Sequence, residues 1–437
     1  MSDALFPDLD PRPAKDGCDE ALPRYETANR TQVELQPCDL ETLLPPGHAA
    51  RLVWRFVEGL DLSAFYATIR AREGRAGRPA IDPQILVALW LYATMDGVGS
   101  AREVDRLCYA HDAYRWLRGG VSVNYHTLSD FRVAHQAALD DLLTQSIAVL
   151  LRQGIVTMAR VAHDGTRVRG CAGAGSFRRG ATLQECLRDA RKQVARTIKQ
   201  GAGGASSGAG AAQVRAAEDR LARVEKALAQ LPAVAATKAR QTGKRASEPR
   251  VSTTDPDARV MKMADGGFRP AYNVHLATDV ESRIIVGVRT LNEGNDHSQL
   301  TPMLDAIAQR LGRLPAAQLV DGGFSTKAEI TAATARAVTV YAPPMRRGSR
   351  TRGADQPAPG DSPAVIAWRA RMATDEAKTI YKARAATAEW VNADARTHRT
   401  LGRPLVRGLT KVHTWALWVA LAHNMIRTLD IVPHLMT

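Results

Sequence analysis

Three acidic residues stand in settings where carboxylates can do phosphodiester chemistry. Asp164 in Val-Ala-His-Asp-Gly-Thr and Asp321 in Leu-Val-Asp-Gly-Gly-Phe-Ser each end a short apolar run. Glu389 lies in a basic segment of helical character. Carboxylates brought together from two strand ends and a helix can hold hard divalent cations, which neutralise a phosphate and activate an oxygen nucleophile. The set predicts a site for two Mg²⁺ or Mn²⁺ ions.

Each of these residues has a plainer interpretation when taken alone. An Asp after a strand more often caps a helix or a turn, and Asp-Gly is a common turn signal. Glu389 sits among Ala and Arg residues and fits a solvated helix face equally well. Small neighbours, Gly165 and Gly322-Gly323, would let the backbone approach a bound phosphate closely. Only the joint arrangement indicates a catalytic site.

The charge balance indicates a phosphate-rich partner. The chain has 437 residues, with 59 Lys and Arg against 45 Asp and Glu, and a formal net charge of +14. Cations that neutralise phosphates release counterions, which favours double-stranded DNA as a partner. A merely basic protein remains the alternative on charge alone. The residues predicted to contact DNA are basic side chains spread along the chain: Arg115, Arg132, Lys244, Arg245, Arg396, Arg407 and Lys411.

The cysteines and the apolar stretches predict a cytoplasmic protein. Five scattered cysteines form no Cys-x-x-Cys pair and fit a reducing compartment. The N-terminus is acidic and lacks the apolar core of a signal peptide. The longest apolar stretches, residues 85–95 and 415–425, are too short to span a membrane.

The first part of the chain divides into an irregular arm, residues 1–40, and a helical region, residues 41–152. Asp82 and Pro83 suit the start of an apolar helix, and Ser100 with Glu103 forms a capping box. Thr127 is predicted to cap a later helix. Short helices with exposed Arg and aromatic residues are compatible with a helix-turn-helix-like DNA-binding module or with a plain helical bundle.

Residues 153–430 are predicted to form one mixed α/β domain, followed by a tail, residues 431–437. Its expected order is a strand over residues 155–163 leading into Asp164, a helical insertion, an antiparallel hairpin and then alternating helices and strands. The remaining elements are a hairpin over 270–279 and 284–291, a helix from Gln299 capped by Asp296, a strand at 318–320, a helix at 326–335, a strand at 338–342, and helices at 374–396 and 412–429.

The insertion, at about residues 172–262, contains an amphipathic helix over residues 214–231 and ends in a basic tail. A solvated helical hairpin is the favoured interpretation. A DNA-clamping arm is the sharper alternative, in view of the charge sign.

Several blocks resemble the insertion-sequence DDE transposases, most closely the IS-eleven-eighty-two-like branch. Tyr381, Arg384, Glu389 and Arg396 resemble the Tyr-Arg-Glu-Lys signature of that family. Further blocks resemble segments on either side of it: His126-Thr127 with Phe131-Arg132, residues 255–263, Tyr272-Asn273, residues 406–412 and residues 421–424. The similarity covers about residues 40 to 430. Two features depart from the strict signature: its last position is Arg396 rather than Lys, and one extra residue separates Arg384 from Glu389.

The resemblance implies a ribonuclease-H-like catalytic domain behind an all-α DNA-binding domain. It implies that Asp164, Asp321 and Glu389 hold the metal ions, that Arg384 contacts a phosphate, and that Tyr381 positions Arg384 or the DNA. It also implies a transposase that binds terminal inverted repeats, cuts phosphodiester bonds and joins 3′-hydroxyl ends to target DNA. The expected setting is a homodimer, without a membrane, associated with the bacterial nucleoid.

Two alternatives use the same residues differently. A catalytically inactive relative would only bind DNA as a regulator, and a nuclease of the same fold would cut without joining. An α/β metabolic enzyme is disfavoured because the chain has no phosphate-loop or dinucleotide glycine pattern.

Overall fold

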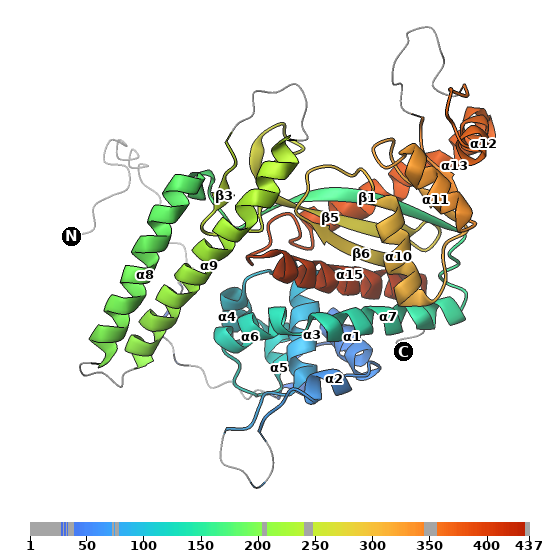
Figure 1. Ribbon diagram of the computed structural model, residues 1–437. Helices are drawn as coiled ribbons and strands as arrows, with labels where there is room; N and C mark the ends of the chain where they lie inside the picture. Colours follow the sequence, from blue (N-terminus) through green and yellow to red (C-terminus); the bar gives the residue numbers. More distant parts are fainter. Residues whose placement is uncertain are drawn as a thin grey trace, which may run out of the picture. The chain divides into compact units, whose positions relative to one another are not determined.

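The computed structural model (Figure 1) describes residues 39–71, 74, 78–202, 208–239, 248–344 and 356–432, with residues 28, 30, 31 and 33. Contacts divide the chain into two units, Met1–Asp39 and Leu40–Thr437, and every described helix and strand belongs to the second. The predicted N-terminal arm and tail therefore lie almost wholly outside the described residues. The domain boundaries within the second unit stay a prediction.

The second unit begins with helices that local sequence signals explain. Asp82 accepts a hydrogen bond from the amide of Gln84 at the start of α3, and Ser100 accepts from that of Glu103 at the start of α4, as predicted. The predicted cap at Thr127 is wrong, because Asn124 takes this role by accepting from the Thr127 amide. The elements are η1 (Glu41–Leu43), α1 (Ala49–Glu58), α2 (Ser63–Tyr66), α3 (Pro83–Met95), α4 (Ala101–Ala110), α5 (Asp112–Arg118), α6 (Tyr125–Ala134) and α7 (Gln136–Arg152).

A six-stranded sheet follows, in the order β4-β5-β1-β7-β8, with β6 also paired to β5. The predicted antiparallel hairpin is confirmed as β5 and β6, and β5 also pairs antiparallel with β1. β7 and β8 continue from β1 in parallel, so the sheet is mixed. The strands are β1 (Arg160–Arg169), β4 (Arg259–Lys262), β5 (Phe268–Asp279), β6 (Ile285–Leu291), β7 (Ala317–Leu319) and β8 (Thr339–Tyr341). A separate pair joins β2 (Phe177–Arg178) to β3 (Val251–Ser252), next to η2 (Ala174–Ser176).

Two expectations about the sheet region are corrected. The first strand was expected to end before Asp164, but β1 runs from Arg160 through Asp164 to Arg169, because β5 pairs with its whole length. Asp296 was expected to cap the helix that begins near Gln299. Its carboxylate instead accepts from Asn273, while Glu329 of α11 accepts from the amide of Thr301 in the first turn of α10. Residues distant in sequence thus take the place of the helix cap expected at Asp296.

The remaining helices belong to the insertion and to the C-terminal half. They are α8 (Gly180–Ala202), α9 (Gly208–Ala239), α10 (Leu300–Leu311), α11 (Lys327–Ala335), α12 (Pro363–Ala373), α13 (Asp375–Arg384), α14 (Trp390–Thr397) and α15 (Leu409–Ile431). The helix expected over 374–396 is confirmed as a continuous helical run from Asp375 to Thr397. Thr374 caps α13 after α12 ends, and a π-helical turn, Ala385–Glu389, joins α13 to α14.

Helix α15 lies between the sheet and the N-terminal helices (Figure 1), and it contributes residues to the largest hydrophobic core. The indole of Trp418 donates to the carbonyl of Arg132 in α6, at 3.0 Å. The Asn424 amide pairs with both backbone groups of Ile285 in β6, each at 2.8 Å. None of the described helices is long and apolar enough to cross a membrane.

Replacing Asn424 with Leu is expected to destabilise the protein by about 2–4 kcal/mol. The change keeps the branching of the side chain but leaves the buried amide and carbonyl of Ile285 without their Asn424 partners. Chemical unfolding of the two proteins measures the difference. Thr428→Val is the matched control on the same helix, because the Thr428 hydroxyl donates only to the carbonyl of Asn424 within the helix. Equal losses in the two variants would contradict this role for Asn424.

Candidate active site

Two of the three predicted carboxylates lie just beyond the parallel pairing of β1 and β7. That pairing ends at Ala162 of β1 and Leu319 of β7, so Asp164 and Asp321 each follow it by two residues. The negative charge of Asp321 raises the pKa of Asp164, so the two carboxylates interact. Asp321 follows the end of β7, and its carboxylate accepts from the amide of Gly323 at 2.6 Å. A Cβ at position 323 would lie 2.9 Å from that same oxygen, so this tight turn requires glycine.

Arg384 joins the third carboxylate to the first. Its guanidinium lies 3.0 Å from Oδ1 of Asp164 and 3.5 Å from Oε1 of Glu389. The Arg384 side chain is 10% exposed, whereas that of Glu389 is 63% exposed. One buried cation therefore contacts a mostly buried carboxylate on the sheet and an exposed one on the helix. Asn392 of α14 donates to the other oxygen of Asp164, at 3.3 Å.

Tyr381 interacts electrostatically with the three carboxylates and with Arg384. Burial raises the pKa of Tyr381 above its ordinary value of 10.0, and the charges of Asp321, Asp164 and Glu389 act in the same direction. The Arg384 cation works against them. That these residues form one shared site stays a prediction.

The surroundings of Asp164 disfavour the charged form of its carboxyl group. Burial raises the pKa of Asp164, and the negative charges of Asp321 and Asp296 add to this effect. The Arg384 cation and the amide of Gly165 oppose it. A further cation beside these carboxylates would favour the charged form of Asp164.

A group of residues that the sequence analysis did not assign lies behind Asp164. Asp296 accepts from Asn273 at 2.7 Å and lies 3.2 Å from Nε2 of His275, whose Nδ1 is 3.0 Å from His163. Burial and the charge of His275 hold the pKa of His163 well below its ordinary value, so this ring is neutral. His163 directly precedes Asp164 in the chain, and that adjacency was the available signal. Asp296 offered no signal, because its partners are distant in sequence.

The π-helical turn Ala385–Glu389 explains how the extra residue in the signature is accommodated. In an α-helix, one added residue would turn Glu389 about 100° away from Arg384. A π-helical turn holds one more residue than an α-helical turn, so it absorbs the insertion. The spacing departs from the strict signature, but the contact between Arg384 and Glu389 is made.

The carboxylates suit divalent cations by donor type and by position. They are hard oxygen donors around one guanidinium, whose positive charge occupies the space between Asp164 and Glu389. They are not drawn together as a preformed cage. Within the described ranges, no group of three or more His, Cys, Asp or Glu side chains is close enough to hold a metal ion. Glu389 is the exposed member and is the one free to rotate inward.

Comparisons with known proteins agree with the chemistry of these residues. A family model described as "Transposase domain (DUF772)" matches residues 38–134, over the N-terminal helices. A second model, described as "Transposase DDE domain", matches residues 361–429, which include Arg384 and Glu389. The two matches support an insertion-sequence DDE transposase in general. Searches of curated proteins and of solved structures found no match.

The residues predicted to contact DNA fall in different places. Arg132 is 5% exposed and lies against Trp90 and Trp415, with its guanidinium donating to the carbonyl oxygens of Gly99 and Leu405. The structure therefore gives Arg132 a packing role and no free surface for a phosphate. Its burial, beside two aromatic rings, also lowers its pKa to about 10.

The other predicted DNA contacts differ in exposure and location. Arg115 pairs with Asp112 on α5, and Arg396 is exposed on α14 with its Nε donating to the carbonyl of Asn392. Among the described residues, no hydrogen bond or ion pair joins Arg396 to the three carboxylates. Lys244 and Arg245 lie outside the described residues.

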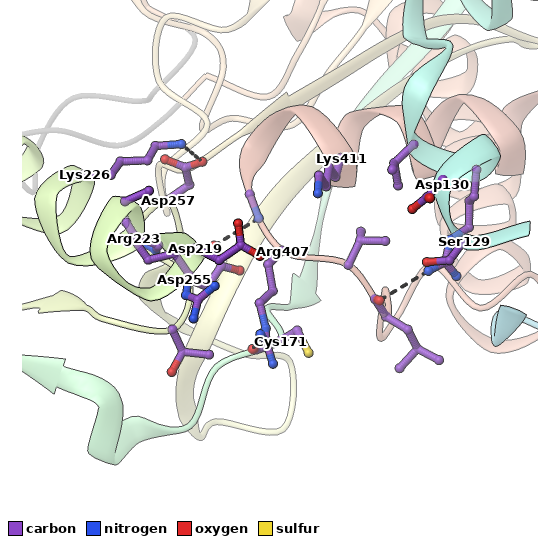
Figure 2. Close-up of a pocket in the computed structure, with 18 residues that line it drawn as sticks. Ser129, Asp130, Cys171, Asp219, Arg223, Lys226, Asp255, Asp257, Arg407 and Lys411 are labelled. Carbon is purple, nitrogen blue, oxygen red and sulfur yellow. Dashed lines mark hydrogen bonds and ion pairs between the residues drawn. The ribbon is translucent and has the colours of Figure 1, made fainter. Parts of the chain in front are cut away.

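Arg407 and Lys411 line a groove of about 530 Å³ at the start of α15, away from the carboxylates (Figure 2). Two aspartates from a distant segment hold this helix end. Asp255 accepts from the amide of Gly408 at 3.1 Å, and Asp257 from that of Leu409 at 3.0 Å. The two resembling blocks, residues 255–263 and 406–412, are thus partners in capping α15.

Deleting Ala386 is expected to change stability by less than about 1 kcal/mol, because the π-helical turn can revert to an α-helical turn. Arg384 and Glu389 stay on one face of the shortened helix. Deleting Ala393, an equally exposed alanine of α14, is the matched control. No π-helical turn absorbs that loss, so Asp394 rotates away from His423 and the variant loses about 2–4 kcal/mol. Similar losses from the two deletions, measured by thermal unfolding, would rule out this account.

Asp255→Asn is expected to make the protein more stable at neutral pH. Burial raises the pKa of Asp255 above its ordinary 3.8, against hydrogen bonds from Tyr272 and Gly408. The folded wild type thus binds this proton more tightly than the unfolded chain does, and it loses stability as the pH rises from 3.8 through the raised pKa. Asparagine keeps the acceptor and removes this loss.

Unfolding midpoints measured between pH 4 and pH 7 test this expectation. The advantage of Asp255→Asn should grow with pH and vanish near the ordinary carboxyl pKa. Asp130→Asn, at an exposed position of the same groove, controls for the change of net charge. An advantage that stays constant over this pH range would contradict the assignment.

Proposed function

We propose that this protein is a DNA transposase of the Tyr-Arg-Glu-Lys signature type, in the IS-eleven-eighty-two-like branch, with a ribonuclease-H-like catalytic domain. It binds the terminal inverted repeats of its insertion sequence, cuts phosphodiester bonds and transfers 3′-hydroxyl ends to target DNA. The observation that supports the proposal is that Arg384 lies within 3.5 Å of both Asp164 and Glu389, with the charge of Asp321 acting on Asp164. The strand order is consistent with this fold.

The three carboxylates are the ligands of two Mg²⁺ or Mn²⁺ ions. When bound, the ions neutralise charge on the phosphate and activate the attacking oxygen. Asp164 and Asp321 stay fixed by the register of β1 and β7, and Asn392 orients Asp164 by donating to its outer oxygen. Glu389 completes the set by rotating from its exposed position.

Besides the metal ligands, the proposed site contains Arg384, which would bind a phosphate group. A guanidinium fork binds phosphate oxygens as readily as carboxylate oxygens. With metal ions bound at Asp164 and Glu389, Arg384 would be available to the phosphate next to the cut bond. Tyr381, on whose pKa the Arg384 cation acts, would position Arg384 or the DNA.

The surrounding organisation follows from the same proposal. The N-terminal helices, residues 41–152, form a DNA-binding domain, and residues 153–430 form the catalytic domain with its helical insertion. Arg115, Arg396, Arg407 and Lys411 are its exposed candidates for contacts with the DNA backbone. Two protomers act together, because both ends of the element must be joined. The proposed setting is the cytoplasm of a bacterium, at the nucleoid.

Asp321→Asn tests the proposal directly. The purified protein is mixed with Mg²⁺ and DNA taken from both flanks of its own gene. The wild type should release cut ends, chelation of the metal should stop cutting, and Asp321→Asn should slow cutting by about 10³-fold or more. The affinity of the variant for DNA should stay within about twofold, since no phosphate contact is lost.

Asp375→Asn is the matched control, because the Asp375 side chain is 97% exposed on α13, ahead of Tyr381 in the same helix. Cutting that survives Asp321→Asn would discard the site. Cut ends without any joined product would favour a nuclease of the same fold, and binding without cutting would favour a regulator.

A further inference from the structure

The helical insertion forms a two-helix hairpin of α8 and α9 whose outer part is strongly basic. The half of α8 from Arg191 onward carries Arg191, Lys192, Arg196 and Lys199 and no acidic residue. Its two acidic residues, Glu185 and Asp189, lie in the first half. This uneven distribution differs from a solvated helix face, on which charges of both signs alternate.

The basic residues form a row on one face of α8. At 100° per residue, Arg188, Lys192, Arg196 and Lys199 fall within about 80° of each other, and about 16 Å separates the first from the last. All four are exposed, and none has an acidic partner among the residues that the structure describes. In contrast, Arg191, which points to another face, pairs with Glu225 of α9 at 3.4 Å.

The second helix adds to this face. Arg220 of α9 donates to Gln193 at 2.6 Å, which places its guanidinium beside the row. Lys192, Arg196 and Arg220 line a hollow of about 590 Å³, in which Asp189 is the only acid and the other lining side chains are Gln and Thr. Lys192, Arg196 and Lys199 line a second hollow next to it. Cations and amide donors around shallow, open hollows suit phosphate groups.

The base of the hairpin is fixed, so the row has a defined position. Leu183, Ala227, Val234 and Val251 form a small core of their own at the base. Lys226 of α9 pairs with Asp257 at 2.7 Å, the same carboxylate that caps α15 (Figure 2). The main packing partner of α8 is α9. The hairpin is therefore an anchored projection.

We propose that the α8–α9 hairpin is a DNA-binding arm whose row Arg188, Lys192, Arg196 and Lys199, with Arg220, contacts the backbone of duplex DNA outside the cut bond. The choice of DNA as the partner rests on the proposed function. The row would follow about five base pairs, given a rise of 3.4 Å per base pair. The contact reads no sequence, since it is made to phosphates alone.

The test measures how binding depends on salt. The full-length protein is titrated onto a random-sequence duplex at about 50 to 200 mM salt, and the slope of log K against log salt is compared among variants. K192Q/R196Q/K199Q should lower the slope by about 2.7, or about 0.9 per lost phosphate contact. The charge-preserving K192R/R196K/K199R should restore most of it.

R160Q/R313Q/R336Q is the matched control, because it removes the same charge from half-buried or exposed positions far from the hairpin in sequence. Its slope should change by less than about 1. The proposal that the hairpin binds DNA would be overturned by equal slope changes in the two glutamine triples, or by no change in the hairpin triple.

Cutting at saturating DNA separates this inference from the proposed function. The hairpin triple should keep the cutting rate of the wild type, because the carboxylates are untouched. A protein that never cuts DNA but whose slope depends on the arm would overturn the proposed function and support the arm. If the protein cuts DNA normally and the salt slope is unchanged in the hairpin triple, the proposed function is supported and the DNA-binding arm is overturned.

Discussion

The burial of α15 is the constraint on which the other parts of the structure depend. This helix is apolar along most of its length. It buries its apolar surface by lying between the sheet and the N-terminal helices. Its polar atoms then fix the orientation of both neighbours. Asn424 completes the hydrogen bonding of β6, Trp418 donates to the end of α6, and His423 contacts Asp394 of α14 and the carbonyl of Arg283. One helix thereby positions the sheet, the helix that follows Glu389 and the N-terminal region.

The start of α15 extends this constraint to the insertion. Asp257 accepts from the amide of Leu409 and pairs with Lys226 of the hairpin, so a single buried carboxylate joins two elements far apart in sequence. A buried carboxylate with several donors is costly to disturb. The orientation of the hairpin is therefore set by the same contacts that hold the helix end.

The carboxylate site follows a different physical rule. Two aspartates on adjacent parallel strands and a glutamate on a nearby helix repel one another, and burial disfavours the charge on Asp164 further. Arg384 offsets this repulsion from a nearly buried position. The π-helical turn serves the same end, because it keeps Glu389 on the face of Arg384 despite one additional residue. Ionisable groups whose pKa is shifted by burial and by neighbouring charges are typical of functional sites.

The sequence by itself determined the elements whose signals are local. Asp82 with Pro83 and Ser100 with Glu103 mark helix starts, alternation marks the β5–β6 hairpin, and the pattern around Tyr381, Arg384 and Glu389 marks a helix. Only the tertiary structure decided the features that depend on distant partners. These are the run of β1 through Asp164, the contact of Arg384 with Asp164, the burial of Arg132, and the place of Asp296 beside His275 rather than at a helix cap. Helix caps and turns depend on residues within a few positions of one another. Strand register and buried hydrogen bonds depend on which distant segments pack together.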